Sequence, residues 1–185
     1  MSRVFHLLLA MVFLVAAPTF AAVTGPAVGT VAPALVGAVD AKGDMQTLSG
    51  LSGKQGLVLM FFRSASWCPY CKAQLITMNA DAPAQLARRG YKLAALSYDS
   101  PEVLAKFAAE RRIGFTLLSD EGSRTIDAYG LRDPQYPAES RAHGVPQPVI
   151  LVIAPNGRVR AKLMEEGYKT RPPLEAVLAA IDSLR

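Results

Sequence analysis

The sequence predicts an α/β fold, a three-layer α/β/α sandwich with a mixed central sheet. Short apolar runs of strand length alternate with amphipathic helical patterns along most of the 185 residues, and two such runs near the end are separated only by a tight turn. The alternation favours parallel strands covered by helices on both faces, and the turn adds an antiparallel pair. With 51% hydrophobic residues, the chain suits one domain with a sizeable core.

The N-terminal segment is typical of a secretory signal peptide. Arg3 precedes an apolar run over residues 7–17, and small residues follow at 18–22. We expect residues 1–21 to be the signal peptide, cleaved near Ala21, and the mature protein to be periplasmic or secreted. The run is shorter than the roughly 20 residues of a membrane span, so no stable span is expected after cleavage. An uncleaved anchor is the alternative.

The next segments introduce the folded domain. Residues 22–32 are rich in glycine, proline and small side chains and are expected to form a tether, with the domain itself over 33–185. Two strand-like runs, 35–39 and 45–48, surround a turn sequence at 40–44. This pattern predicts a β-hairpin.

A buried strand and a long helix are expected next. Residues 57–62 form a continuous apolar run, which is typical of a strand buried on both faces. Pro69 suits the first position of a helix, because its missing N–H costs nothing there. The helical pattern runs to Gly90, and Pro83 is expected to kink or interrupt it.

The remaining elements alternate as the fold class requires. Strands are expected at 91–97, 115–118, 149–153 and 158–164, and helices after Ser100, after Asp120 and over 172–184. Ser100 is the expected N-cap of the first of these helices, and Pro101 its first residue. A loop covers 131–146, and Pro155-Asn156-Gly157 is a tight turn between two strands.

The most informative stretch is Cys68-Pro69-Tyr70-Cys71, which holds the only two cysteines. It stands where the buried strand passes into the helix, at the carboxyl edge of the sheet, where active sites gather. The helix N-terminus favours a thiolate at Cys68, which would attack a disulfide. Cys71, one turn further and expected to be less exposed, would be the resolving thiol.

Other uses of the cysteines fit less well. A disulfide that encloses only two residues removes little chain entropy, which disfavours a structural bridge. One C-x-x-C supplies only two zinc ligands, so neither a metal nor another cofactor is expected. Trp67 offers either a flat apolar surface to a partner or a core side chain. The formal charge of +5 comes from scattered lysines and arginines, so nucleic acid is not an expected partner.

Residues 62–71 resemble the active-site segment of the thioredoxin superfamily, and the Pro-Tyr dipeptide matches that of glutaredoxins. Residues 94–102, 115–120 and 128–130 resemble the alkyl hydroperoxide reductase/thiol-specific antioxidant (peroxiredoxin-like, redoxin) branch. The similarity covers roughly residues 32–184. It implies a thioredoxin-like fold and thiol-based redox or antioxidant activity.

The chain departs from the peroxidase pattern P-x-x-x-[TS]-x-x-C, in which the hydroxyl helps to bind peroxide. Counting back from Cys68 gives Ala65 and Phe61, and from Cys71 gives Cys68 and Ser64, so neither register supplies the motif. A second departure lies further along the chain. Pro148 stands where many peroxiredoxins carry an activating arginine.

In thioredoxins a cis-proline at the place of Pro148 shapes the substrate groove, and Pro146 competes for this assignment. The resemblance implies that Cys68 and Cys71 are catalytic. It also implies a set of substrate-binding residues, Trp67, Pro69, Tyr70 and Pro148. Thioredoxins also bury an acidic residue in the strand beneath the cysteines, but Phe62 stands there, so the proton acceptor of the resolving thiol is not identified.

Three functions follow from these features. The first is an exported thiol–disulfide oxidoreductase that acts on a protein or small-molecule disulfide and exchanges electrons with a thiol-redox partner protein. The second is a thiol peroxidase in which Cys68 is oxidised to sulfenic acid and Cys71 resolves it. The third is a copper-binding assembly protein that uses His143 with the cysteines. The direction of the reaction, the substrate, the electron donor and the oligomeric state are left open.

Overall fold

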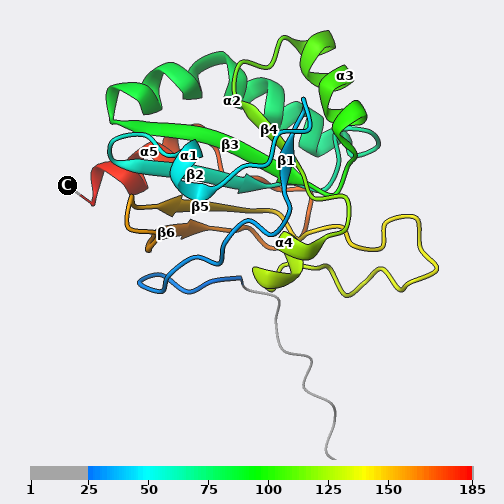
Figure 1. Ribbon diagram of the computed structural model, residues 1–185. Coiled ribbons are helices and arrows are strands. Elements are labelled where there is room, and N and C mark those ends of the chain that lie inside the picture. The colour runs from blue at the N-terminus through cyan, green and yellow to red at the C-terminus, as the bar shows by residue number, and fades with distance from the viewer. Residues whose placement is uncertain (1–24, 185) are drawn as a thin grey trace, which may run out of the picture.

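The computed structural model describes residues 25–184 and confirms the predicted sandwich. One six-stranded mixed sheet, in the order β1-β4-β3-β2-β5-β6, lies between two helical layers (Figure 1). The elements are β1 (Val39–Asp40), α1 (Leu48–Leu51), β2 (Gly56–Phe61), α2 (Pro69–Arg88), β3 (Tyr91–Ser97), α3 (Pro101–Arg111), β4 (Thr116–Ser119), α4 (Arg124–Ala128), β5 (Val149–Ile153), β6 (Val159–Leu163) and α5 (Leu174–Asp182). The expected signal peptide and its cleavage point lie outside the described residues.

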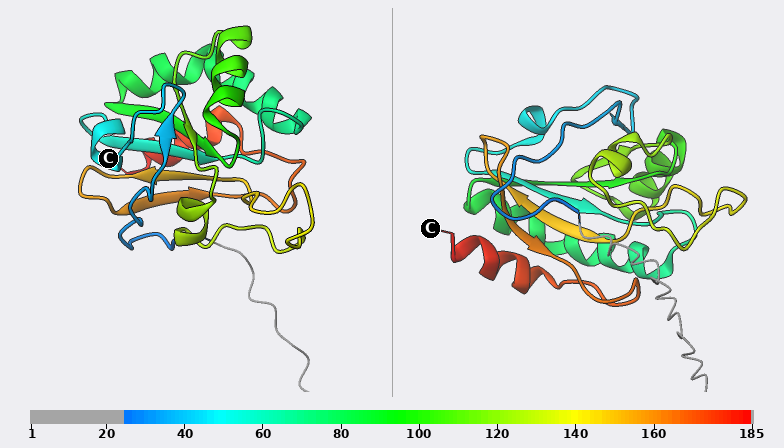
Figure 2. Two further views of the ribbon diagram at one scale, coloured as in Figure 1. Left: turned by 45° about the vertical axis from the view of Figure 1, so that its right-hand side comes forward. Right: turned by 90° about the horizontal axis from the view of Figure 1, so that it is seen from below.

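The sheet separates two hydrophobic clusters. Strand β2 is buried along its whole length, and its side chains alternate between the faces with the period of two that a strand imposes. Val58 and Met60 pack with α2, α3 and α5 on one face, whereas Leu57 and Leu59 pack with α1 and α4 on the other (Figures 1 and 2). This explains why β2 reads as one unbroken apolar run.

The strand directions bring five chain segments to one edge of the sheet. Strands β2, β3 and β4 are parallel, so their carboxyl ends lie together. Strand β5 is antiparallel to β2 with Phe61 opposite Val149, and β6 is antiparallel to β5 with Ile150 opposite Leu163. The loop that enters β5 and the segment that leaves β6 therefore reach the edge where β2 passes into α2.

The N-terminal part differs from the prediction in two places. Within the expected tether, residues 29–32 lie beside β6, where Gly29 N–H donates to Val159 O and Ala32 N–H to Gly157 O, each at 2.8 Å. The expected hairpin reduces to one bridge between Val39 and Met45, and β1 pairs with β4 instead. Residues 48–51 are helical, because the Thr47 hydroxyl caps them by accepting the Gly50 N–H.

Two details of the helices also differ. The 20-residue helix α2 continues through Pro83 without interruption. Ser100 is the N-cap residue of α3, but its side chain makes no capping hydrogen bond to the backbone. In the described part of the chain, no helix has the length and apolar content that crossing a membrane requires.

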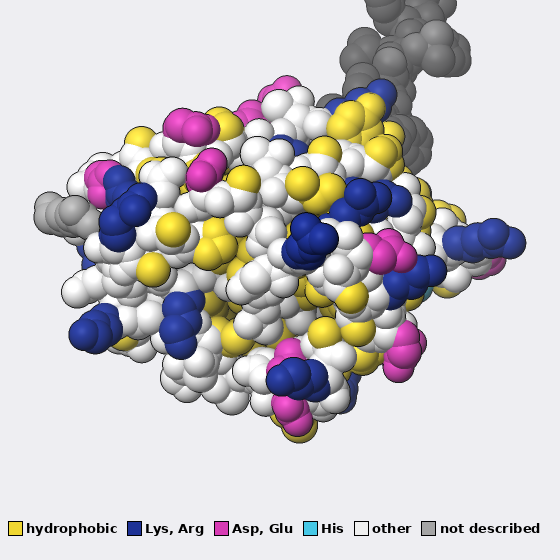
Figure 3. Space-filling model, turned by 90° about the horizontal axis from the view of Figure 1, so that it is seen from above, with side chains coloured by type: hydrophobic (Ala, Val, Ile, Leu, Met, Phe, Trp, Pro, Cys, Tyr) yellow, Lys and Arg dark blue, Asp and Glu magenta, His cyan; other side chains and the backbone are white. Residues whose placement is uncertain are grey.

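The surface charge is dispersed. On the face seen in Figure 3, lysine and arginine side chains are spread among acidic and apolar ones and form no continuous stripe. This distribution matches the modest formal charge of +5. This face therefore has no concentrated positive patch that would attract a polyanion.

Candidate active site

The two cysteines lie at the start of α2 and form a disulfide, with 5.3 Å between their Cα atoms. Cys68 is the N-cap of the helix, its Sγ accepts the Cys71 N–H at 3.2 Å, and Pro69 occupies the first turn as predicted. A sulfur in this position meets the free N–H groups and the positive end of the helix dipole. Both favour a thiolate at Cys68 once the pair is reduced.

Both sulfurs are shielded in the disulfide form. Cys68 is 1% exposed and Cys71 is 0% exposed, so the expected difference in exposure between them is almost absent. The neighbouring Trp67 and Tyr70 are 43% and 40% exposed. A substrate therefore meets these two aromatic side chains first, and side chains at the site must move before it reaches Cys68.

A buried carboxylate fixes the loop that leads to Cys68. Asp99, at the carboxyl end of β3, accepts the Ser64 hydroxyl at 2.7 Å, the Ala65 N–H at 2.6 Å and the Ser97 hydroxyl at 3.0 Å. Burial raises the pKa of the Asp99 carboxyl, and these three hydrogen bonds oppose the rise. Asp99 thus ties the end of β2 to the end of β3.

The same network occupies Ser64, one of the two hydroxyls that flank Ala65 at the hydroxyl position of the peroxidase pattern. Besides donating to Asp99, Ser64 Oγ accepts the Ser66 N–H at 2.9 Å and the Trp67 N–H at 3.3 Å. The Ser66 carbonyl in turn accepts the Lys72 ammonium at 2.8 Å. Ser64 therefore has no remaining donor for a peroxide, and it acts on the loop instead.

Arg63 is a buried cation held by aromatic rings. Its guanidinium lies 5.2 Å from the ring centroid of Trp67, 5.0 Å from that of Tyr136 and 4.1 Å from that of Tyr168, and it donates to the Tyr136 hydroxyl. The side chain is 1% exposed, and its Nε and Nη1 have no hydrogen-bond partner. Cation–π attraction therefore joins the cysteine loop to two distant segments.

A second arginine reaches the disulfide from the segment between β6 and α5. Arg171 Nη2 lies 3.4 Å from Cys71 Sγ, and its Nη1 donates to the Tyr168 and Thr170 carbonyls. Burial lowers the pKa of Arg171 to about 10, and the nearby Arg63 contributes to the decrease. The group still carries its charge at neutral pH and faces the sulfur of Cys71.

The predicted substrate-binding residues divide into two groups. Trp67, Pro69 and Tyr70 are exposed around the disulfide. Trp67 Nε1–H donates to the Tyr98 hydroxyl at 2.9 Å, and Tyr70 meets Tyr168 edge to face with 6.0 Å between ring centroids. These contacts support the interpretation of Trp67 as surface rather than core.

Pro148 lies where it was expected, but its peptide bond is not cis. It immediately precedes β5, in a pocket of about 120 Å³ that Tyr168 also lines. No peptide bond in residues 25–184 is cis, so the expectation of a cis-proline at Pro148 or Pro146 is wrong. Pro148 still lies next to the end of β2, because the following residue Val149 pairs with Phe61. Its backbone lacks the shape that a cis bond would give.

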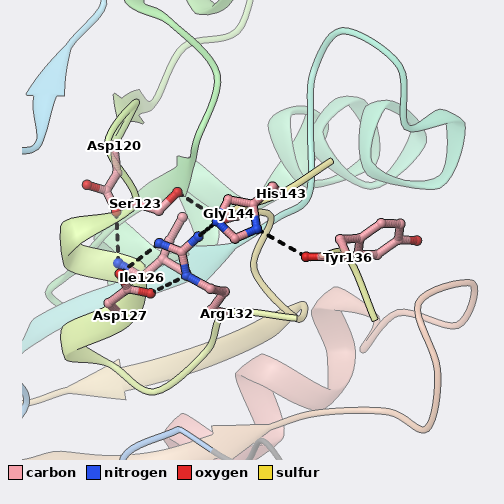
Figure 4. Close-up of polar contacts among 8 residues, drawn as sticks. All are labelled: Asp120, Ser123, Ile126, Asp127, Arg132, Tyr136, His143 and Gly144. Carbon is pink, nitrogen blue, oxygen red and sulfur yellow. Dashed lines mark hydrogen bonds and ion pairs between the residues drawn. The ribbon is translucent and has the colours of Figure 1, made fainter. Parts of the chain in front are cut away.

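Both ring nitrogens of His143 contact residues other than the cysteines (Figure 4). Its Nδ1 lies 3.1 Å from the Tyr136 carbonyl and its Nε2 lies 3.0 Å from Arg132 Nη1. The carbonyl requires a proton on Nδ1 and the guanidinium requires a lone pair on Nε2, so both ring nitrogens are engaged. Within the described residues, no three histidine, cysteine or acidic side chains gather as metal ligands. The copper hypothesis therefore has no supporting geometry.

Arg63, Asp99, Tyr168 and Arg171 are among the site residues that were missed in the sequence. Arg63 carried a signal, because a charged residue directly continues a strand that is otherwise all apolar. Asp99 stood in a stretch assigned only to the family resemblance. Tyr168 and Arg171 carried no local signal, because only the antiparallel pairing of β5 and β6 brings them to Cys71.

Comparison with known proteins agrees with this geometry. The model of the AhpC/TSA family matches residues 28–162. The crystal structure of peroxidoxin BcpB from Mycobacterium tuberculosis has a TM-score of 0.72 at 21% identity, covering 85% of this chain and 97% of that one. At this identity the likeness shows the fold alone.

The related sequences carry two kinds of name. Peroxiredoxin Bcp of Escherichia coli (strain K12) is 30% identical over 92 residues, which are 50% of this chain and 57% of Bcp. Thiol-disulfide oxidoreductase ResA of Geobacillus thermodenitrificans (strain NG80-2) is 28% identical over 176 residues, covering 95% of this chain and 90% of ResA. The chain thus spans little more than half the length of Bcp. Both names denote thiol-based redox proteins.

Arg171 provides a first test of the site. Because its cation stabilises the thiolate of the reduced pair, we expect Arg171→Gln to raise the apparent pKa of the reduced pair by about one unit. The reduction potential should become more negative by about 30 mV. For this two-electron couple, that shift corresponds to a tenfold change in the equilibrium constant for reduction of the disulfide. Thiolate absorbance against pH and equilibration with glutathione buffers measure both.

The matched control is Arg160→Gln, which removes the same charge from an exposed position near the opposite end of β6. An unchanged potential in Arg171→Gln, or an equal shift in Arg160→Gln, would show that Arg171 does not act on the pair.

Asp99→Asn tests the carboxylate network. We expect the free energy of unfolding to fall by about 1–3 kcal/mol, because hydrogen-bond partners in the buried loop lose their acceptor. Since burial raises the folded-state pKa of Asp99, the folded protein binds this proton more tightly. Its stability then decreases as pH rises from about 4 through the folded-state pKa.

Asparagine does not titrate, so the stability difference between the wild type and Asp99→Asn should be larger near pH 4 than near pH 7. Urea unfolding at both pH values measures it. Ser97→Ala removes both hydrogen bonds between Ser97 Oγ and Asp99 but keeps the carboxyl, so its stability should still decrease as pH rises from about 4 to about 7, at least as steeply as in the wild type. A difference that grows with pH would contradict the raised pKa.

Proposed function

The chain belongs to the AhpC/TSA family, and we propose that within this family it is a thiol–disulfide oxidoreductase that works through Cys68 and Cys71. The observation that carries the proposal is the disulfide at the N-terminus of α2, closed within one helical turn. Its geometry supports the exchange chemistry, because the attacking and resolving sulfurs are already within bonding reach. No element has to unfold for the pair to close.

The exchange needs only these two sulfurs and a substrate disulfide. The Cys68 thiolate attacks one substrate sulfur, the substrate disulfide breaks, and its other sulfur leaves as a thiolate. The Cys71 thiolate then attacks Cys68 Sγ, closes the pair and releases the second substrate thiolate. Two electrons pass from the pair to the substrate, and the reverse sequence oxidises a dithiol. A thiol-redox partner protein resets the pair, and the direction follows from its potential relative to that partner.

Named residues support separate parts of this sequence. The helix N-terminus and the Cys71 N–H stabilise negative charge on Cys68. Arg171 offers a cation to Cys71 at 3.4 Å, which favours the thiolate that must attack Cys68. Asp99, through Ser64 and Ala65, holds the loop that sets the position of Cys68.

A thiol peroxidase is the second candidate, because the relatives include peroxiredoxin Bcp. In that reaction a peroxide oxygen would convert the Cys68 thiolate to sulfenic acid, and Cys71 would condense with it and release water. The occupied Ser64 hydroxyl disfavours this reaction, because it is committed to Asp99 and to two backbone N–H groups.

One experiment separates the two candidates. We expect the reduced protein to reduce insulin disulfides catalytically, and Cys71→Ser to accumulate a mixed disulfide through Cys68. The variant Cys68→Ser is the matched control and should trap nothing. Rapid catalytic consumption of hydrogen peroxide without insulin reduction would favour the peroxidase and exclude the exchange reaction as the main activity.

We also propose that the protein is exported to the periplasm or secreted. The support is the N-terminal pattern of Arg3, an apolar run and small residues before Ala22. Mass spectrometry of the protein from fractionated cells should find a mature chain that begins at Ala22. A full-length chain confined to the cytoplasm would contradict the proposal.

A further inference from the structure

A surface groove of about 280 Å³ lies beside Cys71. One wall is the first part of α2, with Tyr70 and Gln74, and the other is the segment before α5, with Lys169 and Arg171. Arg171 also contacts Cys71 Sγ, so this lining residue connects the groove with the redox pair. Tyr70, another lining residue, is 40% exposed.

The charge of the groove has one sign. Its lining includes the cations Lys169 and Arg171 and no acidic side chain. Arg171 Nε is buried and has no hydrogen-bond partner, and the buried Arg63 adds to the local positive field. A guanidinium whose Nε–H is left unpaired is suited to a carboxylate, which accepts charge-assisted hydrogen bonds.

Gln74 adds a second unpaired polar group. Its side chain is only 9% exposed, and neither Oε1 nor Nε2 has a hydrogen-bond partner. Leaving such groups buried and unpaired is unfavourable, so a ligand that pairs with them is favoured. One acceptor and one donor side by side match the N–H and C=O of a peptide backbone.

We propose that this groove binds a polypeptide substrate that carries a carboxylate side chain within about two residues of its disulfide cysteine. This inference rests on the proposed exchange function and specifies its substrate. The carboxylate pairs with Arg171 and Lys169, and the peptide backbone pairs with the Gln74 amide. Arg171 reaches from the groove to Cys71. A carboxylate about two residues from the substrate cysteine lies about 7 Å of extended chain away from it. The carboxylate can therefore pair with Arg171 while the substrate sulfur lies at the redox pair.

The test compares two disulfide-bonded peptides that differ only by Glu or Gln two residues from the cysteine. The reduced wild-type protein should reduce the Glu peptide about tenfold faster at low salt. The preference should shrink as ionic strength rises. The measured quantity is the ratio of the two rates, which cancels any change in the reactivity of the cysteines themselves.

Variants locate the preference in the groove. Arg171→Gln and Lys169→Gln should each bring the ratio towards one, whereas Arg160→Gln should leave it unchanged. Gln74→Leu should slow both peptides, and its matched control Gln85→Leu, on the same helix, should slow neither. A ratio that survives in Arg171→Gln and Lys169→Gln would overturn the inference.

The outcome also separates the inference from the function on which it rests. Equal rates for the two peptides in the wild type would overturn the acidic-substrate inference and leave the exchange reaction standing. Reduction of neither peptide, together with no reduction of insulin, would overturn the proposed exchange function and the inference with it.

Discussion

The buried guanidinium of Arg63 is the constraint around which the site is built. A buried charge is expensive unless other groups compensate it. Within the described chain its compensation comes from Trp67, Tyr136 and Tyr168. These three rings come from the cysteine loop, the loop before β5 and the segment after β6. Holding the cation therefore holds three separate segments around the disulfide.

The sheet topology makes that convergence possible. Because β5 runs antiparallel to β2, and β6 antiparallel to β5, the segments that carry Tyr136 and Tyr168 arrive where β2 ends. Asp99 arrives at the same edge from the parallel strand β3. The result is a carboxylate that fixes the cysteine loop, one guanidinium stacked against Trp67 of that loop, and a second guanidinium at Cys71. Ala65 stands at the hydroxyl position of the peroxidase pattern, and the neighbouring Ser64 hydroxyl is used to build the loop.

How far the sequence predicts this structure depends on whether the signal is local. The buried strand, Pro69 at the helix start and the edge position of Cys68 all follow from short-range patterns, and all three are confirmed. The predicted strand at 45–48 is wrong in its second half, because a single Thr47 hydroxyl is enough to start a helical turn. The cis-proline was carried over from the family resemblance rather than from this chain's residues.

Long-range partners could not be predicted in the same way. Arg171 and Cys71 are 100 residues apart, and no spacing rule connects them. Only the register of β5 and β6 does so. The same limit applies to Asp99, whose role depends on the pairing of β2 with β3. It applies also to the three aromatic rings that surround Arg63.

The position of Arg171 links the reactivity of the pair to the choice of substrate. Its Nη2 faces Cys71 Sγ, its Nε is buried without a hydrogen-bond partner, and the side chain also lines the groove. In the disulfide form the sulfur carries no charge, so the cation is not balanced by the pair. Reduction places a thiolate next to Nη2, and the proposed carboxylate would use Nε. Two different atoms of one planar group therefore serve the two anions, and the rigid geometry of the guanidinium fixes the distance between them.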